Sequence, residues 1–317
     1  MPGILTYSEH PRTALELQSL AAELGPKVGG ARVAAWVGPN PPADLGAYGA
    51  DEVVHLTGPG LDAFVTEAYT DALAALVDEA KPEVILIGAT RSGKDLAGRL
   101  AARLRAGSIS EATKVAVGDG GAIEAERTFL SGNAVQVVRA SARPVIITLP
   151  PRAFPVPEKA GPAAAGREKA VTATTRAPQV VDVKQKAAGG LRIEEAPFIV
   201  SAGRGFKKKE DLKLIEDLAH ALGAAVGCSR PLATDLAWMT EDHWVGLSGH
   251  KVAPKVYMTL GISGQIQHIA GIRDSGFIIS VNNDPNAPIF KNCDLGVVAD
   301  LYKFIPALKA EAAKAKG

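Results

Sequence analysis

The sequence predicts an α/β protein with two domains, an N-terminal α/β domain with an antiparallel annex and a C-terminal doubly wound parallel sheet. Short apolar runs alternate with apolar residues at helical spacing along both halves of the chain. No aromatic residue lies between Phe154 and Phe198, and this stretch is rich in small, polar and proline residues, as is typical of a linker. We therefore expect domains at 1–185 and 190–317, with a linker at about 155–190.

In the N-terminal half, predicted strands and helices alternate at first, and β-rich segments with turn residues follow. Strands are expected at Gly3–Tyr7, Ala31–Val37 and Val84–Gly88, and helices around Thr13–Leu24, Ala72–Val77 and Asp95–Arg105. The run Val84–Gly88 is wholly apolar, as is typical of a strand buried on both faces of a parallel sheet. Further on, Val135–Val138 and Pro144–Leu149 are β-rich and flanked by turn residues. They predict a hairpin appended to the sheet.

The C-terminal half is more regular. Five apolar strands are expected, at Phe198–Ala202, Ala224–Cys228, Val256–Leu260, Phe277–Val281 and Leu295–Ala299. Helical patterns lie between most of them, which favours right-handed crossovers and a parallel sheet. In such a sheet, ligands bind beyond the carboxyl ends of the strands. The loops after the strands are therefore the place to look for a site.

Bulk composition excludes several classes of function. The 317 residues carry 35 basic and 34 acidic side chains, so there is no basic excess for a nucleic-acid backbone. The two cysteines, Cys228 and Cys293, lie in apolar surroundings and favour buried thiols over a disulfide. Neither a signal peptide nor a membrane-spanning run is evident, and no metal or hydrolase motif appears. We expect a soluble, cytoplasmic protein that neither inserts into membranes nor binds nucleic acid.

All five strand ends of the C-terminal half carry residues suited to a polar ligand. The first ends in Ser201-Ala202-Gly203-Arg204-Gly205, which is equally consistent with a phosphate site and with a plain strand-to-helix turn. The others end in Ser229-Arg230-Pro231, in Gly261 to His268 opening into a helix, in Val281-Asn282-Asn283-Asp284-Pro285 and in Ala299-Asp300-Leu301. A helix start suits a pyrophosphate. Together the five loops predict a rim that holds a large anionic ligand with ribose-like hydroxyls.

Three of these segments carry a family resemblance. YMTLGISGQIQHIAGIRDSGFIISVN (257–282), DPNAPIFKNCDLGVVADLYKFIPAL (284–308) and SAGRGFKKKEDLKLIEDLAHALGAAVGCSRP (201–231) resemble the electron-transfer flavoprotein α subunit, the FixB family. RTFLSGNAVQVV (127–138) carries a looser resemblance in the N-terminal half. The resemblance implies a C-terminal FAD-binding domain and a β subunit that completes a heterodimer. It also implies a second nucleotide, AMP or FAD, in that β subunit.

Carried onto matching positions, the resemblance implies a set of flavin-binding residues. Arg204 and the Ser263–His268 loop would surround the phosphates and ribityl chain, and Asn282, Asp300 and Leu301 the adenosine end. Ser229, Arg230 and the loop Val245–Ser248 would approach the isoalloxazine. The full set is Arg204, Ser229, Arg230, Val245, Gly246, Leu247, Ser248, Ser263, Gly264, Gln265, Ile266, Gln267, His268, Asn282, Asp300 and Leu301.

Three of these residues are expected to tune the flavin, and no catalytic residue or metal ligand is expected. Arg230 would supply a fixed positive charge, His268 would donate to the pyrimidine carbonyl, and Ser248 would offer its hydroxyl to N5. Without the resemblance, His268 reads as a satisfied core histidine and Arg230 as a structural ion-pair residue.

The chain departs from its apparent family at a few positions near this site. Family members often carry glutamine at Leu247, so that contact is in doubt, and threonine at Ser248, where serine keeps the hydroxyl. Ser280 stands where alanine is usual, which we expect to be a neutral packing change. Trp244 is expected only to pack near the flavin loop.

The segment Gly88-Ala-Thr-Arg-Ser-Gly93-Lys94-Asp95 fits GxxxxGK between a strand and a helix. A phosphate-binding P-loop needs serine or threonine at position 95 for magnesium, where this chain has aspartate. We therefore interpret the segment as a strand-to-helix turn, with Asp95 in the first helical turn.

Three functional hypotheses follow. In the first, the chain is an electron carrier between flavin dehydrogenases and a quinone reductase, without substrate turnover of its own. In the second, it is a subunit of a bifurcating enzyme whose partner binds a second FAD and oxidises NADH. In the third, it is a flavin-free structural partner, against which the intact strand-end loops argue.

Overall fold

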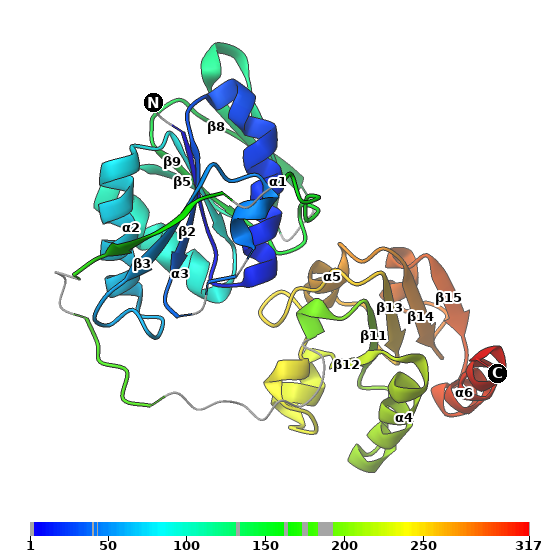
Figure 1. The fold of residues 1–317 in the computed structure, drawn as a ribbon. Helices are drawn as coiled ribbons and strands as arrows, with labels where there is room; N and C mark the ends of the chain where they lie inside the picture. The colour runs from blue at the N-terminus through cyan, green and yellow to red at the C-terminus, as the bar shows by residue number, and fades with distance from the viewer. Residues whose placement is uncertain are drawn as a thin grey trace. The chain divides into compact units, whose positions relative to one another are not determined.

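A computed structural model describes residues 3–39, 41–42, 44–130, 134–161, 164–172, 177–182 and 193–316, with side chains to residue 314. The chain divides into two compact units, Met1–Lys184 and Gln185–Gly317 (Figure 1). Both units are α/β with parallel sheets, so the predicted fold class is confirmed.

The first unit is built on a seven-stranded parallel sheet with the strand order β10-β3-β2-β1-β4-β9-β5. Its strands are β1 (Ile4–Tyr7), β2 (Arg32–Val37), β3 (Glu52–Thr57), β4 (Val84–Gly88), β5 (Gly107–Ile109), β9 (Val145–Leu149) and β10 (Gly166–Ala170). β1, β4 and β9 are entirely buried, as continuous apolar strands require. The sequence pattern did not predict three of these strands, namely the short edge strand β5, the partly exposed strand β3, and β10.

Helices cover both faces of this sheet (Figure 1). α2 (Thr66–Ala80) and α3 (Arg91–Leu104) pack in one apolar cluster, and α1 (Pro11–Val28) packs in the other. Proline is the first residue of α1, and α2 ends at Ala80, with Lys81 as its C-cap just before Pro82.

The antiparallel annex exists, but its predicted pairing was wrong. β8 (Ala134–Ala140) pairs with β7 (Ile123–Phe129), which pairs with β6 (Ala112–Val117). The segment Val145–Leu149 is instead β9, a central strand parallel to β4. The difference lies in burial: β9 is apolar throughout, whereas β8 alternates between exposed and half-buried residues. Residues 131–133 lie outside the described residues.

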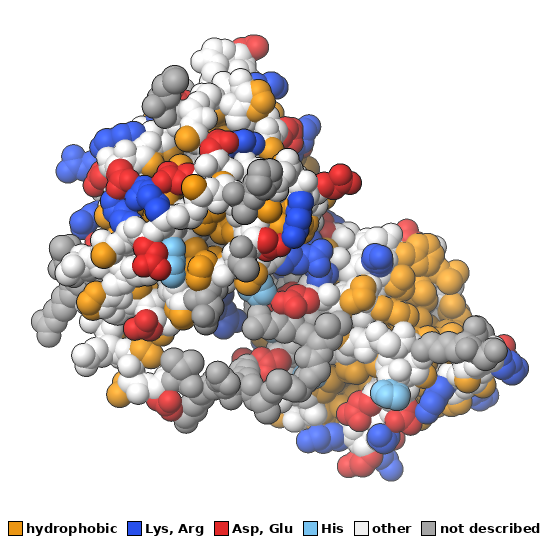
Figure 2. Space-filling model, in the orientation of Figure 1, with side chains coloured by type: hydrophobic (Ala, Val, Ile, Leu, Met, Phe, Trp, Pro, Cys, Tyr) orange, Lys and Arg blue, Asp and Glu red, His pale blue; other side chains and the backbone are white. Residues whose placement is uncertain are grey.

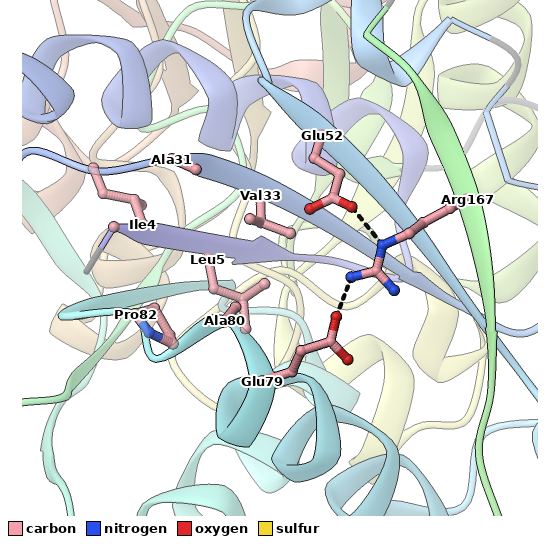
Figure 3. A pocket seen from close by; sticks show the side chains of 10 residues that line it. Ile4, Leu5, Ala31, Val33, Glu52, Glu79, Ala80, Pro82 and Arg167 are labelled. Carbon is pink, nitrogen blue, oxygen red and sulfur yellow. Dashed lines mark hydrogen bonds and ion pairs between the residues drawn. The ribbon is translucent and has the colours of Figure 1, made fainter. Parts of the chain in front are cut away.

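The predicted linker contains a strand. β10 (Gly166–Ala170) lies within 155–190 and pairs parallel to β3 at the sheet edge; residues 162–163, 173–176 and 183–190 of that stretch lie outside the described residues. Charge helps to hold β10 in place, because Arg167 pairs with Glu52 and Glu79 (Figure 3). Lys169 also pairs with Glu79. Composition missed this strand because it has no apolar face to reveal it.

Replacing Arg167 with methionine should loosen β10. The change keeps the apolar stem and removes two ion pairs, each worth about 0.2–1 kcal/mol at such exposure. Hydrogen exchange at the amides of residues 166–171 should accelerate by about fivefold while β1 is unaffected. Lys114→Met, which removes an ion pair in the annex, is the control. Equal exchange in Arg167→Met and wild type would show that backbone pairing alone holds the strand.

The segment from Gly88 to Asp95 is a strand-to-helix turn, not a P-loop. Residues 91–94 are already helical, and Thr90 caps α3 by accepting a hydrogen bond from Gly93 N at 2.9 Å. The expectation for Asp95 was wrong, because it lies beyond the first turn and accepts a hydrogen bond from Thr66 Oγ1.

The second unit is a five-stranded parallel sheet with the strand order β12-β11-β13-β14-β15. The strands are β11 (Phe198–Ala202), β12 (Ala225–Cys228), β13 (Val256–Leu260), β14 (Ile278–Asn282) and β15 (Leu295–Val298). α4 (Leu212–Leu222) and α6 (Leu301–Lys316) pack on one face, and α5 (Ile266–Ile272) on the other. The five predicted strands are therefore confirmed to within a residue.

The surfaces of the two units differ. In Figure 2 blue and red side chains alternate over the first unit, whereas a broad orange area covers one side of the second. Phe277, Leu295 and Val298, at or near the outer strands β14 and β15, are each more than 40% exposed. Among the described residues, no helix combines the length and the apolar character that a membrane crossing requires.

Candidate functional site

The strand order of the second unit places a candidate ligand site between β11 and β13. Starting from β11, the chain adds β12 on one side and then β13, β14 and β15 on the other, so its direction of winding reverses there. Loops leaving the two strands in opposite directions open a crevice at their carboxyl ends. A cavity of about 710 Å³ lies at this position.

Glycines let the two loops at this crevice touch through their backbones. Gly203 N donates to Leu260 O at 2.9 Å, and Gly205 N donates to Gly261 O at 3.1 Å. A Cβ on Gly203 would stand 2.1 Å from Gly261 O, and Gly261 has a φ of +68°. No other residue fits at either position, so these glycines form the floor of the crevice.

The cavity brings together twelve of the sixteen predicted residues. It is lined by Arg204, Ser229, Arg230, Val245, Gly246, Leu247, Ser248, Ser263, Gln265, Gln267, His268 and Asn282. They come from segments as far apart in sequence as 204 and 282. This convergence depends on the parallel sheet, which gathers its strand ends at one edge.

Two arginines give the cavity its charge. Arg204 follows β11 and Arg230 follows β12, and both side chains are exposed. Neither forms an ion pair with any residue in the described parts of the chain. Asp235 is the one carboxylate among the residues that line the cavity. The cavity wall therefore has an excess of positive charge and suits an anion.

The loop Val245–Ser248 forms one wall and is fastened to α5 by its backbone. Leu247 N donates to Gln267 O at 2.7 Å, and Val245 N donates to Cys228 O at 2.9 Å. Gly271 in α5 allows this approach, because a Cβ there would stand 2.6 Å from Gly246 Cα. The Leu247 side chain, where a glutamine was expected from the family, is half-exposed and apolar.

His268 projects from α5 and is almost completely buried, with 6% of its surface exposed. Its Nδ1 lies 3.0 Å from Val245 O and its Nε2 lies 3.3 Å from Tyr257 Oη. Burial lowers the pKa of the ring to about 4, so the ring is neutral at pH 7. The carbonyl can only accept, so Nδ1 carries the proton and Nε2 accepts from Tyr257. Donation by Nε2 to a ligand, as the sequence suggested, requires that the ring gain a second proton.

Four predicted residues lie beside the cavity instead of lining it. Gly264 packs on η8 (Pro288–Asn292), and Ile266 begins α5 with an exposed side chain. Asp300 caps α6 by accepting from Tyr302 N at 2.9 Å, and Leu301 packs beneath Gly205 and Gly261. Leu301 therefore supports these two glycines, while Asp300 caps the helix that carries it.

The sequence analysis missed six residues that line the cavity, namely Gly205, Pro231, Asp235, Trp244, Gly261 and Ile262. Gly205, Pro231, Gly261 and Ile262 adjoin predicted residues, so an extended motif would have included them. Asp235 ends a wide π-helical turn, η6 (Pro231–Asp235), that no local pattern announces. Trp244 was expected only to pack near the loop.

A second cavity, of about 240 Å³, lies in the first unit between Glu52, Glu79 and Arg167 (Figure 3). Its charged groups already pair with one another. It therefore offers a ligand no unpaired charge.

Comparison with known proteins agrees with this geometry. A domain family described as "Electron transfer flavoprotein domain" matches residues 5–183, and one described as "Electron transfer flavoprotein FAD-binding domain" matches residues 192–273. The second match contains most of the residues that line the larger cavity.

Curated relatives match over nearly the whole chain. "Electron transfer flavoprotein subunit alpha" of Thermoanaerobacterium thermosaccharolyticum is 38% identical over 306 residues, covering 95% of this chain and 92% of the relative. "Lactate dehydrogenase (NAD(+),ferredoxin) subunit LctC" of Acetobacterium woodii is 35% identical over 317 residues, covering 96% and 76%. "Protein FixB" of Rhizobium meliloti is 34% identical over 311 residues, covering 94% and 88%. The chain belongs to the family of electron-transfer flavoprotein α subunits, which includes FixB.

Proposed function

We propose that this chain binds FAD in the cavity of its second unit and serves as the α subunit of a heterodimeric electron carrier. The carrier would accept electrons from flavin dehydrogenases and pass them to a membrane quinone oxidoreductase. The observation that supports this most directly is the cavity at the β11–β13 crossover, where two unpaired arginines meet backbone glycines and the hydroxyl groups of Ser229, Ser248 and Ser263.

The residues present fit FAD. A cavity of about 710 Å³ is within the range of cofactor sites, and its positive wall complements a pyrophosphate. The close backbone packing of Gly203, Gly205 and Gly261 allows a phosphate to approach the main chain.

Each part of the cavity has a proposed task. Arg204 and the Ser263–His268 loop would hold the phosphates and ribityl chain, with Asn282 nearer the adenosine. Arg230, Ser248 and His268 would lie by the isoalloxazine, and Asp300 and Leu301 would act from beneath the floor. FAD supplies one- and two-electron transfer when bound, while the protein supplies fixed charge and hydrogen bonds.

A partner subunit is part of the proposal. Phe277, Leu295 and Val298 of the second unit are each more than 40% exposed, and exposed apolar side chains are the kind of surface that a partner covers. We propose that this partner is a β subunit and that it holds a second nucleotide, AMP or FAD. Two free thiols, Cys228 and Cys293, suit the reducing cytoplasm, which is the proposed location.

The second candidate function is that of a subunit in a bifurcating complex that oxidises NADH. The likeness to LctC, whose name includes NAD(+) and ferredoxin, favours it. The two candidates differ in flavin content: one FAD plus AMP per heterodimer for the carrier, and two FAD for the bifurcating complex.

Flavin content and NADH reactivity decide between the candidates. The purified heterodimer should be yellow, contain one flavin and keep its absorbance near 450 nm when NADH is added without a dehydrogenase. Two flavins and rapid bleaching would reject the simple carrier in favour of the bifurcating complex. A colourless heterodimer that takes up no FAD would reject both.

A further inference from the structure

Three buried hydroxyl groups lie side by side across the sheet of the second unit. Ser201 in β11 is in register with Thr259 in β13, and Thr259 is in register with Ser280 in β14. In-register residues of parallel strands point to the same face, here the face that α5 covers. All three residues are 0% exposed.

None of the three hydroxyl oxygens has a hydrogen-bond partner among the described residues. Buried polar groups in native proteins are nearly always paired, so three unpaired groups in one row call for an explanation. A neutral packing change, as the sequence suggested for Ser280, does not explain a hydroxyl that costs free energy where it stands.

The row lies directly under the cavity. Two residues further along β14, and therefore on the same face, comes Asn282, and Gly261 follows directly after the end of β13; both line the cavity. Two residues before Thr259 comes Tyr257, a fully buried side chain on the same face. The hydroxyl row is therefore the layer between the floor of the cavity and Tyr257.

Tyr257 connects this layer to His268. Its Oη lies 3.3 Å from His268 Nε2. Burial raises the pKa of Tyr257 far above its usual value, so the phenol stays protonated. The Ser201 hydroxyl comes near enough to oppose this rise, although the two groups do not form a hydrogen bond of good geometry.

The Tyr257 hydroxyl can donate its hydrogen bond in one of two directions, depending on the protonation of His268. While the imidazole is neutral, Tyr257 donates to Nε2. If Nε2 gains a proton, it must donate, so Tyr257 must accept and turn its own proton elsewhere. In an apolar core that proton would be left unpaired, whereas here the hydroxyl oxygen of Ser201 lies near enough to accept it, and Thr259 is in register beside Ser201.

We infer that Ser201, Thr259 and Ser280 form a buried acceptor layer that lets Tyr257 reverse its hydrogen bond to His268, so that the imidazole can take up a proton when negative charge enters the cavity. The ring gains one proton from solvent, and no covalent bond changes in Tyr257 or in the hydroxyl row. This makes Tyr257 a positioning residue for His268. The inference rests on the proposed function in one respect, namely that the bound group becomes more negative on reduction.

Burial and the charge in the cavity determine when the His268 ring takes up a proton. The charged and titratable groups around the ring are Tyr257 from β13, Cys228 from β12, and Arg204, Arg230 and Asp235 on the cavity wall. Burial raises the pKa of Cys228 to about 12, so the thiol carries no charge. Burial disfavours the charged ring, and an anion in the cavity offsets that penalty.

The test measures the protonation of His268 in the intact flavin-loaded heterodimer. Histidine labelled with ¹³C and ¹⁵N allows the six histidines to be titrated by NMR, and the signal missing in His268→Gln identifies the residue. In wild type, the pKa of His268 should rise when the flavin is reduced. In Ser201→Ala combined with Thr259→Val, the pKa in the reduced form should be lower than in wild type by about one unit, a tenfold loss of proton affinity.

A matched variant separates the hydroxyl from the packing. Thr259→Ser keeps the hydroxyl and should retain the wild-type pKa. Removing unpartnered buried hydroxyls with little change in shape is neutral or stabilising, so the double variant should fold. If the double variant keeps its flavin and its His268 has the same pKa in the reduced form as in wild type, the inference is overturned and the proposed function stays intact. A heterodimer without flavin would overturn the proposed function as well.

Discussion

Replacing Arg230 with alanine should lower the midpoint potential of the bound flavin by about 60 mV or more. Arg230 lines the cavity and pairs with no carboxylate in the described chain, so its charge is free to act on a ligand. Reduction adds negative charge to the flavin, and a charged hydrogen bond of about 1.5–3 kcal/mol favours that form. A tenfold change in a one-electron equilibrium corresponds to about 59 mV. Spectroelectrochemical titration of the heterodimer measures the shift.

Arg204→Ala is the control for this experiment. It removes the same charge from the same cavity, but at the position proposed for the phosphates. It should weaken FAD retention by about tenfold or more and shift the potential less than Arg230→Ala does. A normal flavin content with an unchanged potential in Arg230→Ala would place that side chain away from the isoalloxazine.

Replacing Gly264 with alanine should abolish FAD retention and destabilise the second unit by about 3 kcal/mol or more. Gly264 has a φ of +88°, which costs an alanine about 1–2 kcal/mol. The added Cβ would also stand 2.3 Å from Ile289 N and 2.4 Å from Ile289 Cα. Because these are backbone atoms, the loop from Ser263 to Gln265 must move, and with it part of the cavity wall. Flavin absorbance per heterodimer and thermal unfolding measure the two effects.

Gly223→Ala is the matched control. Gly223 ends α4 with a φ of +68°, and a Cβ there meets nothing within 4 Å. It should cost only the backbone strain of about 1–2 kcal/mol and keep the full complement of FAD. Equal losses in the two variants would mean that strain, and not the collision with Ile289, governs the loop.

The second unit was predictable because local and tertiary signals agree there. Each strand is a short apolar run that ends in polar or small residues, and the parallel sheet then gathers those ends at one edge. Twelve of the predicted site residues meet in one cavity for this reason.

The first unit was less predictable, because the errors made there concern which strands pair with one another. Val145–Leu149 and Ala134–Ala140 are both β-rich, and nothing local says that one is central and parallel and the other belongs to the annex. β10 is identified by its backbone pairing with β3 and by its ion pairs with Glu52 and Glu79, all of them partners more than 80 residues away in sequence.

The sequence by itself determined the fold class, the family and the position of the site at the strand ends, because these follow from hydrophobic period and from loop composition. Only the tertiary structure decided what the side chains do there. His268 has both nitrogens engaged by Val245 and Tyr257, Leu301 packs against Gly205 and Gly261, and three hydroxyls line up across the sheet. Hydrogen-bond direction and burial depend on atoms brought together from different strands, and no pattern along one strand contains them.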